Sequence, residues 1–170
     1  WEQKGARWWC QLMLSRKPVV RRRSPIGNMV EVFPGCRSRE ISSEFQRVLE
    51  SGWNQVAAVL QGIGVGEIAN LKGLEISLLD AGEMARIHGE FLQDATPTDV
   101  ITFEHGELLI GVEEAQKQAV EFGTSADREI ALYGIHGMLH LAGFDDHDPA
   151  DAKIMSLRQE ELLLKVFPGL

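Results

Sequence analysis

Glu129-Ile-Ala-Leu-Tyr-Gly-Ile-His-Gly-Met-Leu-His-Leu-Ala-Gly-Phe-Asp-Asp-His147 is the most informative segment of the sequence. His136 and His140 are four residues apart in a segment of helical character, so both imidazoles point to one face of the helix. This spacing is typical of a helix that offers two nitrogen ligands to one metal ion. Gly143 follows, and glycine often ends a helix in a left-handed turn. We expect that turn to bring the next residues back toward the two histidines.

The residues after the turn supply candidates for a third ligand. Two histidines at this spacing also occur by chance, but three of the five histidines of the chain fall between residues 136 and 147. Asp145, Asp146 and His147 lie together after Gly143. A catalytic zinc site commonly has three protein ligands and an open position for water. We therefore expect one Zn²⁺ per chain, with another divalent transition metal as the alternative.

Gly137 separates this segment from zinc peptidases of the His-Glu-x-x-His type, in which a glutamate at that position is the general base. Without that glutamate, peptide hydrolysis lacks its usual proton acceptor. Whichever of Asp145, Asp146 and His147 does not bind the metal is a candidate for proton transfer. Asp145 has a second interpretation, as a turn residue that binds its own backbone.

The rest of the sequence predicts a single α+β domain, with a mixed sheet of about four strands packed with about five helices. We expect strands at 30–33 and 74–79, and a hairpin formed by 98–103 and 107–112. Helices are expected from Ser42, from Asp80, over 113–122, from Thr124 through the histidines, and from Asp148. The last helix is expected to bury Ile154, Met155, Leu157 and Leu162–Leu164.

Charge is distributed unevenly along the 170 residues. Residues 1–28 contain seven Lys and Arg residues and one acidic residue, whereas residues 29–170 carry a net charge of −14. The basic segment shows no amphipathic period, so we expect 1–28 to be a disordered extension and 29–170 to be the domain. A transit peptide and an RNA-binding arm are the two alternatives for this extension. Cys10 and Cys36 form no metal-ligand pattern, and no apolar run is long enough to cross a membrane.

The segment His136-Gly-Met-Leu-His-Leu-Ala-Gly-Phe-Asp145 resembles the signature of the YbeY family of bacterial rRNA maturation factors. Pro97-Thr-Asp-Val-Ile-Thr-Phe103 and Gly106-Glu-Leu-Leu-Ile110 are similar to two further segments of that family. The resemblance implies a zincin-like metal helix in a metal-dependent endoribonuclease that cuts single-stranded RNA, such as rRNA precursors. It also implies a cytoplasmic protein, and small ribosomal subunit proteins or an assembly GTPase as partners. Thr98 and Asp99 match family residues that line the substrate cleft.

Two departures from the family pattern affect these expectations. The third histidine of the family falls where this chain has Asp146, and His147 comes one residue later. Spacing therefore favours Asp146 as third ligand, whereas residue type favours His147. The family also has an arginine, thought to contact phosphate, where this chain has Leu92. The missing arginine and the acidic body favour the alternative function, a non-catalytic, metal-stabilised ribosome assembly factor.

Overall fold

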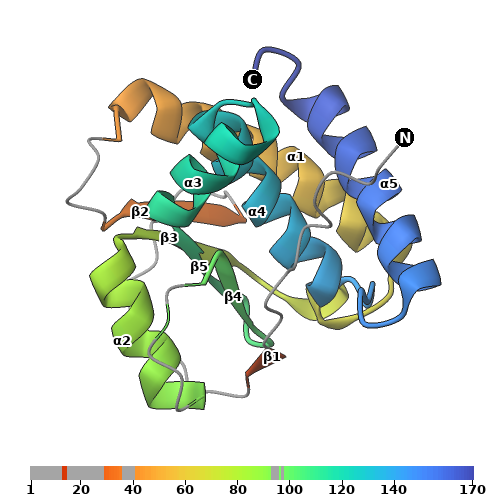
Figure 1. Ribbon diagram of the computed structural model, residues 1–170. Helices are drawn as coiled ribbons and strands as arrows, with labels where there is room; N and C mark the ends of the chain where they lie inside the picture. Colours follow the sequence, from red (N-terminus) through yellow and green to blue (C-terminus); the bar gives the residue numbers. More distant parts are fainter. Residues whose placement is uncertain (1–12, 15–28, 36–40, 93–95, 97) are drawn as a thin grey trace.

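The computed structural model describes residues 13–14, 29–35, 41–92, 96 and 98–170. These residues form one mixed sheet and five α-helices (Figure 1), as the sequence predicts. The strands are β1 (Met13–Leu14), β2 (Val30–Pro34), β3 (Leu74–Leu79), β4 (Val100–Phe103) and β5 (Glu107–Gly111). The helices are α1 (Ser43–Ile63), the 3₁₀ helix η1 (Glu67–Asn70), α2 (Ala81–Leu92), α3 (Val112–Phe122), α4 (Ala126–Leu141) and α5 (Pro149–Val166).

The sheet has the strand order β1-β4-β5-β3-β2. β4 and β5 form the predicted antiparallel hairpin, and β2, β3 and β5 run parallel to one another. β1 was not expected: the backbone of Met13 and Leu14 pairs in parallel with Thr102 and Phe103 of β4. The other residues of the expected extension, 1–12 and 15–28, lie outside the described residues. The domain boundary after residue 28 therefore stays a prediction.

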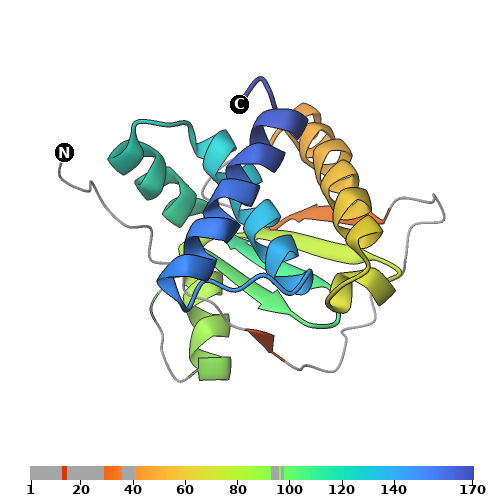
Figure 2. The same ribbon diagram turned by 90° about the vertical axis from the view of Figure 1, so that its right-hand side faces the viewer.

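Side chains that alternate along the strands divide the core into two apolar layers, one on each face of the sheet. The larger layer contains Ile76 and Leu108 together with apolar residues of α1, α4 and α5. Figure 2 shows these three helices on one side of the sheet. The opposite face carries Ile101, Phe103 and Leu109, and α2 covers it. Among the described residues, none of the helices combines the length and apolar character that a membrane span requires.

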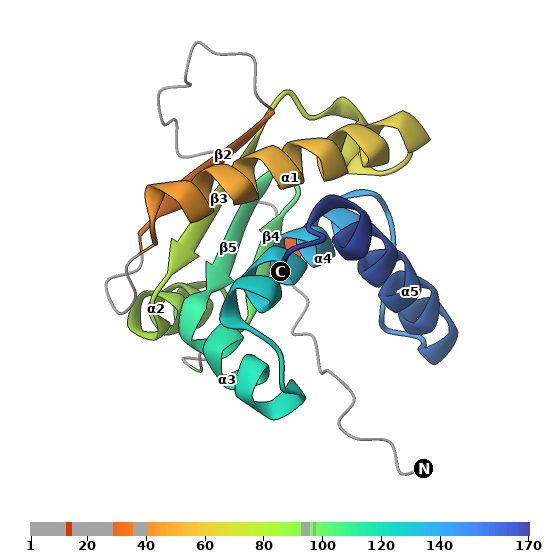
Figure 3. The same ribbon diagram turned by 90° about the horizontal axis from the view of Figure 1, so that it is seen from above.

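Helix α4 lies at the centre of the larger layer and contacts α1, α3, α5 and the sheet (Figure 3). Every residue from Glu129 to Leu141 is buried. Two glycines permit this close packing. A Cβ atom on Gly134 would lie 2.3 Å from Cε2 of Trp53 in α1, and one on Gly137 would lie 2.5 Å from Cδ2 of Leu108 in β5. Helix α4, which carries His136 and His140, is therefore held by α1 on one side and by the sheet on the other.

The starts of the helices follow the expected caps with one exception. The hydroxyl of Ser42 accepts a hydrogen bond from Phe45 N, and Asp148 caps α5 in the same way. The expectation that Thr124 caps α4 is wrong, because Ser125 accepts the bond from Arg128 N. Thr124 instead donates a hydrogen bond of 2.6 Å to the buried carboxylate of Glu129. This bond gives the buried side chain of Glu129 a hydrogen-bond partner in the core.

Helix α5 buries only part of the set predicted from the sequence. Met155, Leu162 and Leu163 are buried, as expected. The expectation for the other three is wrong, because the exposed fractions are 56% for Ile154, 65% for Leu157 and 68% for Leu164. The buried face of α5 includes Gln159 instead, which is only 4% exposed.

Candidate metal centre

The C-terminal half of α4 places His136 and His140 on one face, one helical turn apart. Gly143 then adopts φ of +84°, the left-handed conformation predicted for the end of this helix. Phe144 N donates to Leu139 O, which folds the chain back over the last turn of the helix. The reversal brings Asp146 beside the two histidines, as the sequence predicts for the residues after the turn.

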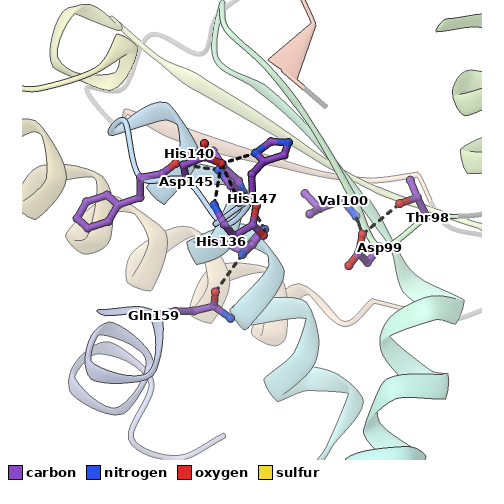
Figure 4. A network of polar contacts seen from close by, with 10 residues as sticks. Thr98, Asp99, Val100, His136, His140, Asp145, His147 and Gln159 are labelled. Carbon is purple, nitrogen blue, oxygen red and sulfur yellow. Dashed lines mark hydrogen bonds and ion pairs between the residues drawn. The ribbon is translucent and has the colours of Figure 1, made fainter. Parts of the chain in front are cut away.

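The side chains of His136, His140 and Asp146 converge in this place, and Figure 4 shows the two histidines side by side. Nε2 of His136 and Nε2 of His140 are 2.9 Å apart. The carboxylate of Asp146 lies 3.8 Å from the first of these atoms and 3.9 Å from the second. Ligand atoms about 2.0–2.2 Å from a tetrahedral ion lie about 3.3–3.6 Å from one another. The observed distances fall on either side of that range, so small side-chain movements let the group hold one metal ion.

The outer nitrogen of each ring is already occupied. Nδ1 of His136 lies 3.0 Å from the amide oxygen of Gln159, and Nδ1 of His140 lies 3.0 Å from the carbonyl oxygen of Phe144. Because both partners are acceptors, they favour a proton on each Nδ1, and a ring with its proton there can offer Nε2 to a metal ion. Burial lowers the pKa of His136 well below its usual value, and burial also lowers the pKa of His140. Two rings that burial keeps neutral, with their Nε2 atoms 2.9 Å apart and a carboxylate alongside, form a group that could hold a cation.

Residues 37–166 match the protein family described as endoribonuclease YbeY. The chain belongs to the YbeY family. The endoribonuclease YbeY of Chlorobium luteolum is 36% identical over 121 residues, which cover 66% of this chain and 84% of the relative. That of Pelotomaculum thermopropionicum is 37% identical over 123 residues, with 62% and 77% covered. The solution structure of TM1509 from Thermotoga maritima shares the fold, with a TM-score of 0.58 and 21% identity over 82% of this chain and 90% of that chain.

Membership of the YbeY family confirms the resemblance stated above. The protein is an endoribonuclease, a hydrolase that cuts RNA within the strand. The alternative of a non-catalytic assembly factor is not favoured, because the curated relatives carry an endoribonuclease name.

The position of Gly137 explains why this centre differs from that of a zinc peptidase of the His-Glu-x-x-His type. A Cβ atom on Gly137 would lie 2.5 Å from Cδ2 of Leu108 and 2.8 Å from Oγ1 of Thr102. Residue 137 therefore faces the sheet and not the metal group. A glutamate has no room there, so a general base must come from another part of the chain.

Asp145 and His147 lie on the open side of the centre, with exposed side-chain fractions of 54% and 73%. Oδ1 of Asp145 accepts hydrogen bonds from the backbone nitrogens of Asp146 and His147. The same oxygen lies 2.5 Å from Nδ1 of His147. This contact raises the pKa of His147 and lowers the pKa of Asp145. Asp145 is thus the turn residue that one interpretation of the sequence expected, and it also orients an imidazole.

The structure separates the two candidates for third ligand. Among the described residues, His136, His140 and Asp146 form one group whose ligand atoms lie within 4.8 Å of one another. His147 falls in a second group, with Asp145 and Asp146. Only Asp146 belongs to both groups. The geometry therefore supports Asp146 over His147 as the third ligand.

Thr98 and Asp99 stand at the start of β4, apart from the histidine cluster (Figure 4). Oγ1 of Thr98 donates to Oδ1 of Asp99 at 3.1 Å, and Val100 N donates to the same oxygen at 2.8 Å. These are the strand-start hydrogen bonds that a purely structural role would require. Burial nevertheless raises the pKa of Asp99 to about 6. Their part in substrate binding stays a prediction.

Gln159 is the residue of the centre that the sequence reasoning missed. It comes from α5, 23 residues after the histidine that it contacts. One signal pointed to it: Gln159 follows Met155 by four residues and precedes Leu162 by three, so it occupies the buried stripe of the helix. A polar residue within an apolar stripe requires a buried partner.

Proposed function

We propose that this endoribonuclease holds one zinc ion between His136, His140 and Asp146 and uses it to cut single-stranded precursor rRNA. The observation that carries the proposal is the pair of Nε2 atoms, 2.9 Å apart, in two rings whose Nδ1 atoms each lie 3.0 Å from an oxygen acceptor. Nitrogen ligands with one carboxylate suit zinc better than magnesium or calcium, which prefer oxygen. Another divalent transition metal fits the same ligands, since imidazole also binds copper, iron and nickel.

The chemistry divides between the metal and the chain. A bound divalent ion supplies Lewis acidity, which polarises a phosphoryl oxygen and makes water more acidic. His136, His140 and Asp146 would hold and orient that ion. Asp145 holds Nδ1 of His147, which leaves Nε2 of His147 available to accept or donate a proton. We assign His147 the proton transfer that the missing glutamate performs in zinc peptidases, with Asp145 as its orienting partner.

Binding of RNA must overcome the acidic character of residues 29–170. Several described cations are engaged in ion pairs: Arg86 with Glu83 and Glu90, Lys117 with Glu114, Arg128 with Glu160, and Arg158 with Glu161. These ion pairs engage four of the eight Lys and Arg residues of the described chain, so at most Arg47, Lys72, Lys153 and Lys165 remain there for phosphate contacts. We infer that the protein cuts free RNA weakly and depends on a partner for delivery, either small ribosomal subunit proteins or an assembly GTPase. Thr98 and Asp99 are the proposed contacts to the RNA strand outside the metal group.

Cleavage of an end-labelled single-stranded RNA tests this function. Wild type should cut the RNA, a chelator should stop cleavage, and added zinc should restore it. His140→Ala should abolish cleavage through loss of a ligand. His147→Ala should keep the metal but slow cleavage about 10²–10⁴-fold, the usual contribution of general acid–base catalysis.

His105→Ala is the matched control for these variants. His105 contacts Glu107 and Phe103 in the β4–β5 hairpin, so this variant should cut RNA like wild type. Undiminished cleavage by His140→Ala would show that the activity belongs to a contaminant. An inactive wild type that still co-sediments with small ribosomal subunits would restore the assembly-factor alternative.

A further inference from the structure

The side chain of Gln159 crosses from α5 to the metal-binding face of α4. Its amide oxygen lies 3.0 Å from Nδ1 of His136, and both residues are buried, with exposed fractions of 4% and 1%. The contact joins side chains from two different helices, so it depends on how α5 packs against α4. Glu160, the residue after Gln159 in α5, forms an ion pair of 2.7 Å with Arg128 of α4, which is a second side-chain contact between the two helices.

We propose that Gln159 is a positioning residue, which keeps the proton of His136 on Nδ1 and so lets Nε2 bind the metal. The inference rests on the metal site proposed above. It concerns a residue that does not itself bind the metal. The amide oxygen acts through hydrogen-bond acceptance, which favours the ring form that has a proton on the nitrogen facing it.

The need for such a residue follows from the distance between the two rings. If the proton of His136 moved to Nε2, that nitrogen could donate a hydrogen bond to Nε2 of His140, 2.9 Å away. The two rings would then satisfy each other, and the metal would have to break that bond before it could bind. A backbone carbonyl, Phe144 O, lies 3.0 Å from Nδ1 of His140 and can only accept, so it favours the proton of His140 on Nδ1 and makes His140 the acceptor of such a bond. The ring that can close the site is therefore His136, and Gln159 is the group that prevents this.

Gln159→Met removes the acceptor and keeps a side chain of similar length in the buried stripe. We expect metal affinity to fall about 10–100-fold, the range found when a partner of a ligating histidine is lost. Gln159→Glu keeps an oxygen acceptor and should bind metal at least as tightly as wild type. Metal affinity is measured on the full chain by competition with a chromophoric zinc chelator, so the result does not depend on RNA cleavage.

Met155→Ala is the matched control for loss of packing. Met155 lies one turn before Gln159 on the same buried face of α5 and does not bond to His136. This variant should lower the melting temperature without changing the zinc affinity of the folded protein. A loss of affinity in Met155→Ala as large as that in Gln159→Met would show that Gln159 only holds α5 in place.

The proton position can be observed directly in wild type. Long-range ¹H–¹⁵N NMR correlations of metal-free protein show which ring nitrogen of His136 carries the proton. We expect Nδ1–H in wild type and in Gln159→Glu, and Nε2–H in Gln159→Met. A proton on Nε2 of His136 in wild type would overturn the proposal, and this measurement does not require Gln159→Met to fold. If Gln159→Met folds, an unchanged zinc affinity in that variant would also overturn the proposal. Failure of wild type itself to bind zinc would instead refute the metal site.

Discussion

Gly137 offers a quantitative test of the claim that α4 rests directly on the sheet. In Gly137→Ala, the new Cβ atom would lie 2.5 Å from Cδ2 of Leu108 and 2.8 Å from Oγ1 of Thr102. Both neighbours are buried, with exposed fractions of 0% and 2%. Carbon atoms pack best at about 3.5–4.0 Å, so the helix and strand must separate locally by about 1 Å. That separation would displace the part of α4 that carries the two histidine ligands, His136 and His140.

The expected free-energy change combines two opposite effects. Overpacking of a filled core costs about 1–3 kcal/mol. Alanine is more favourable than glycine inside a helix by about 1 kcal/mol. Gly137→Ala should therefore range from nearly neutral to about 2 kcal/mol less stable than wild type, since the second effect offsets part of the first.

Gly62→Ala isolates the steric effect. Gly62 lies in α1, and a Cβ atom there would meet nothing within 4 Å, so this variant should gain up to about 1 kcal/mol from helix propensity alone. Urea denaturation of both metal-free variants gives the difference between them, which we expect to be about 1–3 kcal/mol. Zinc affinity should also fall in Gly137→Ala and remain unchanged in Gly62→Ala. Equal stabilisation of the two variants would refute the close packing of α4 on the sheet.

Three further predictions concern charge and the extension. The raised pKa of Asp99, about 6 against 3.8, means that its contribution to stability is present at low pH and is lost as pH rises through 6. The stability of metal-free Asp99→Asn relative to wild type, measured in urea, should thus increase by about 2 kcal/mol between pH ~4 and ~7, and a constant difference would contradict the raised pKa. Leu92→Arg should tighten RNA binding and steepen its salt dependence by about one phosphate contact, whereas Leu92→Met should do neither. A chain that starts at Met29 loses the two-residue strand β1 but none of the core residues of the described chain, so it should melt within a few degrees of the full chain; loss of solubility or a large drop in melting temperature would show that residues 1–28 support the domain.

The parts of the centre that could be predicted are those written in local sequence. His136 and His140 share a face because a helix repeats every 3.6 residues, and Gly143 ends that helix because glycine tolerates positive φ. The return of Asp146 follows from the same turn. These features depend on neighbours in the sequence, so spacing and residue type were enough to predict them.

The parts that could not be predicted depend on packing between distant elements. Whether Gln159 reaches His136 depends on the angle and rotation of α5 against α4, which the apolar residues of α5 did not define. Leu157 and Leu164 appeared in the predicted buried set but lie on the exposed face. The choice between Asp146 and His147 also required coordinates, because the two residues are adjacent in one short loop and the sequence does not show which side chain turns toward the histidines.

Anomalous diffraction at the zinc edge, from crystals grown with zinc, tests the central claim most directly. We expect one strong peak per chain, about 2.0–2.2 Å from Nε2 of His136, Nε2 of His140 and a carboxylate oxygen of Asp146. Asp145 and His147 should stay paired with each other beside that peak. A zinc ion bound by His147 in place of Asp146, or no zinc between His136 and His140, would contradict the account.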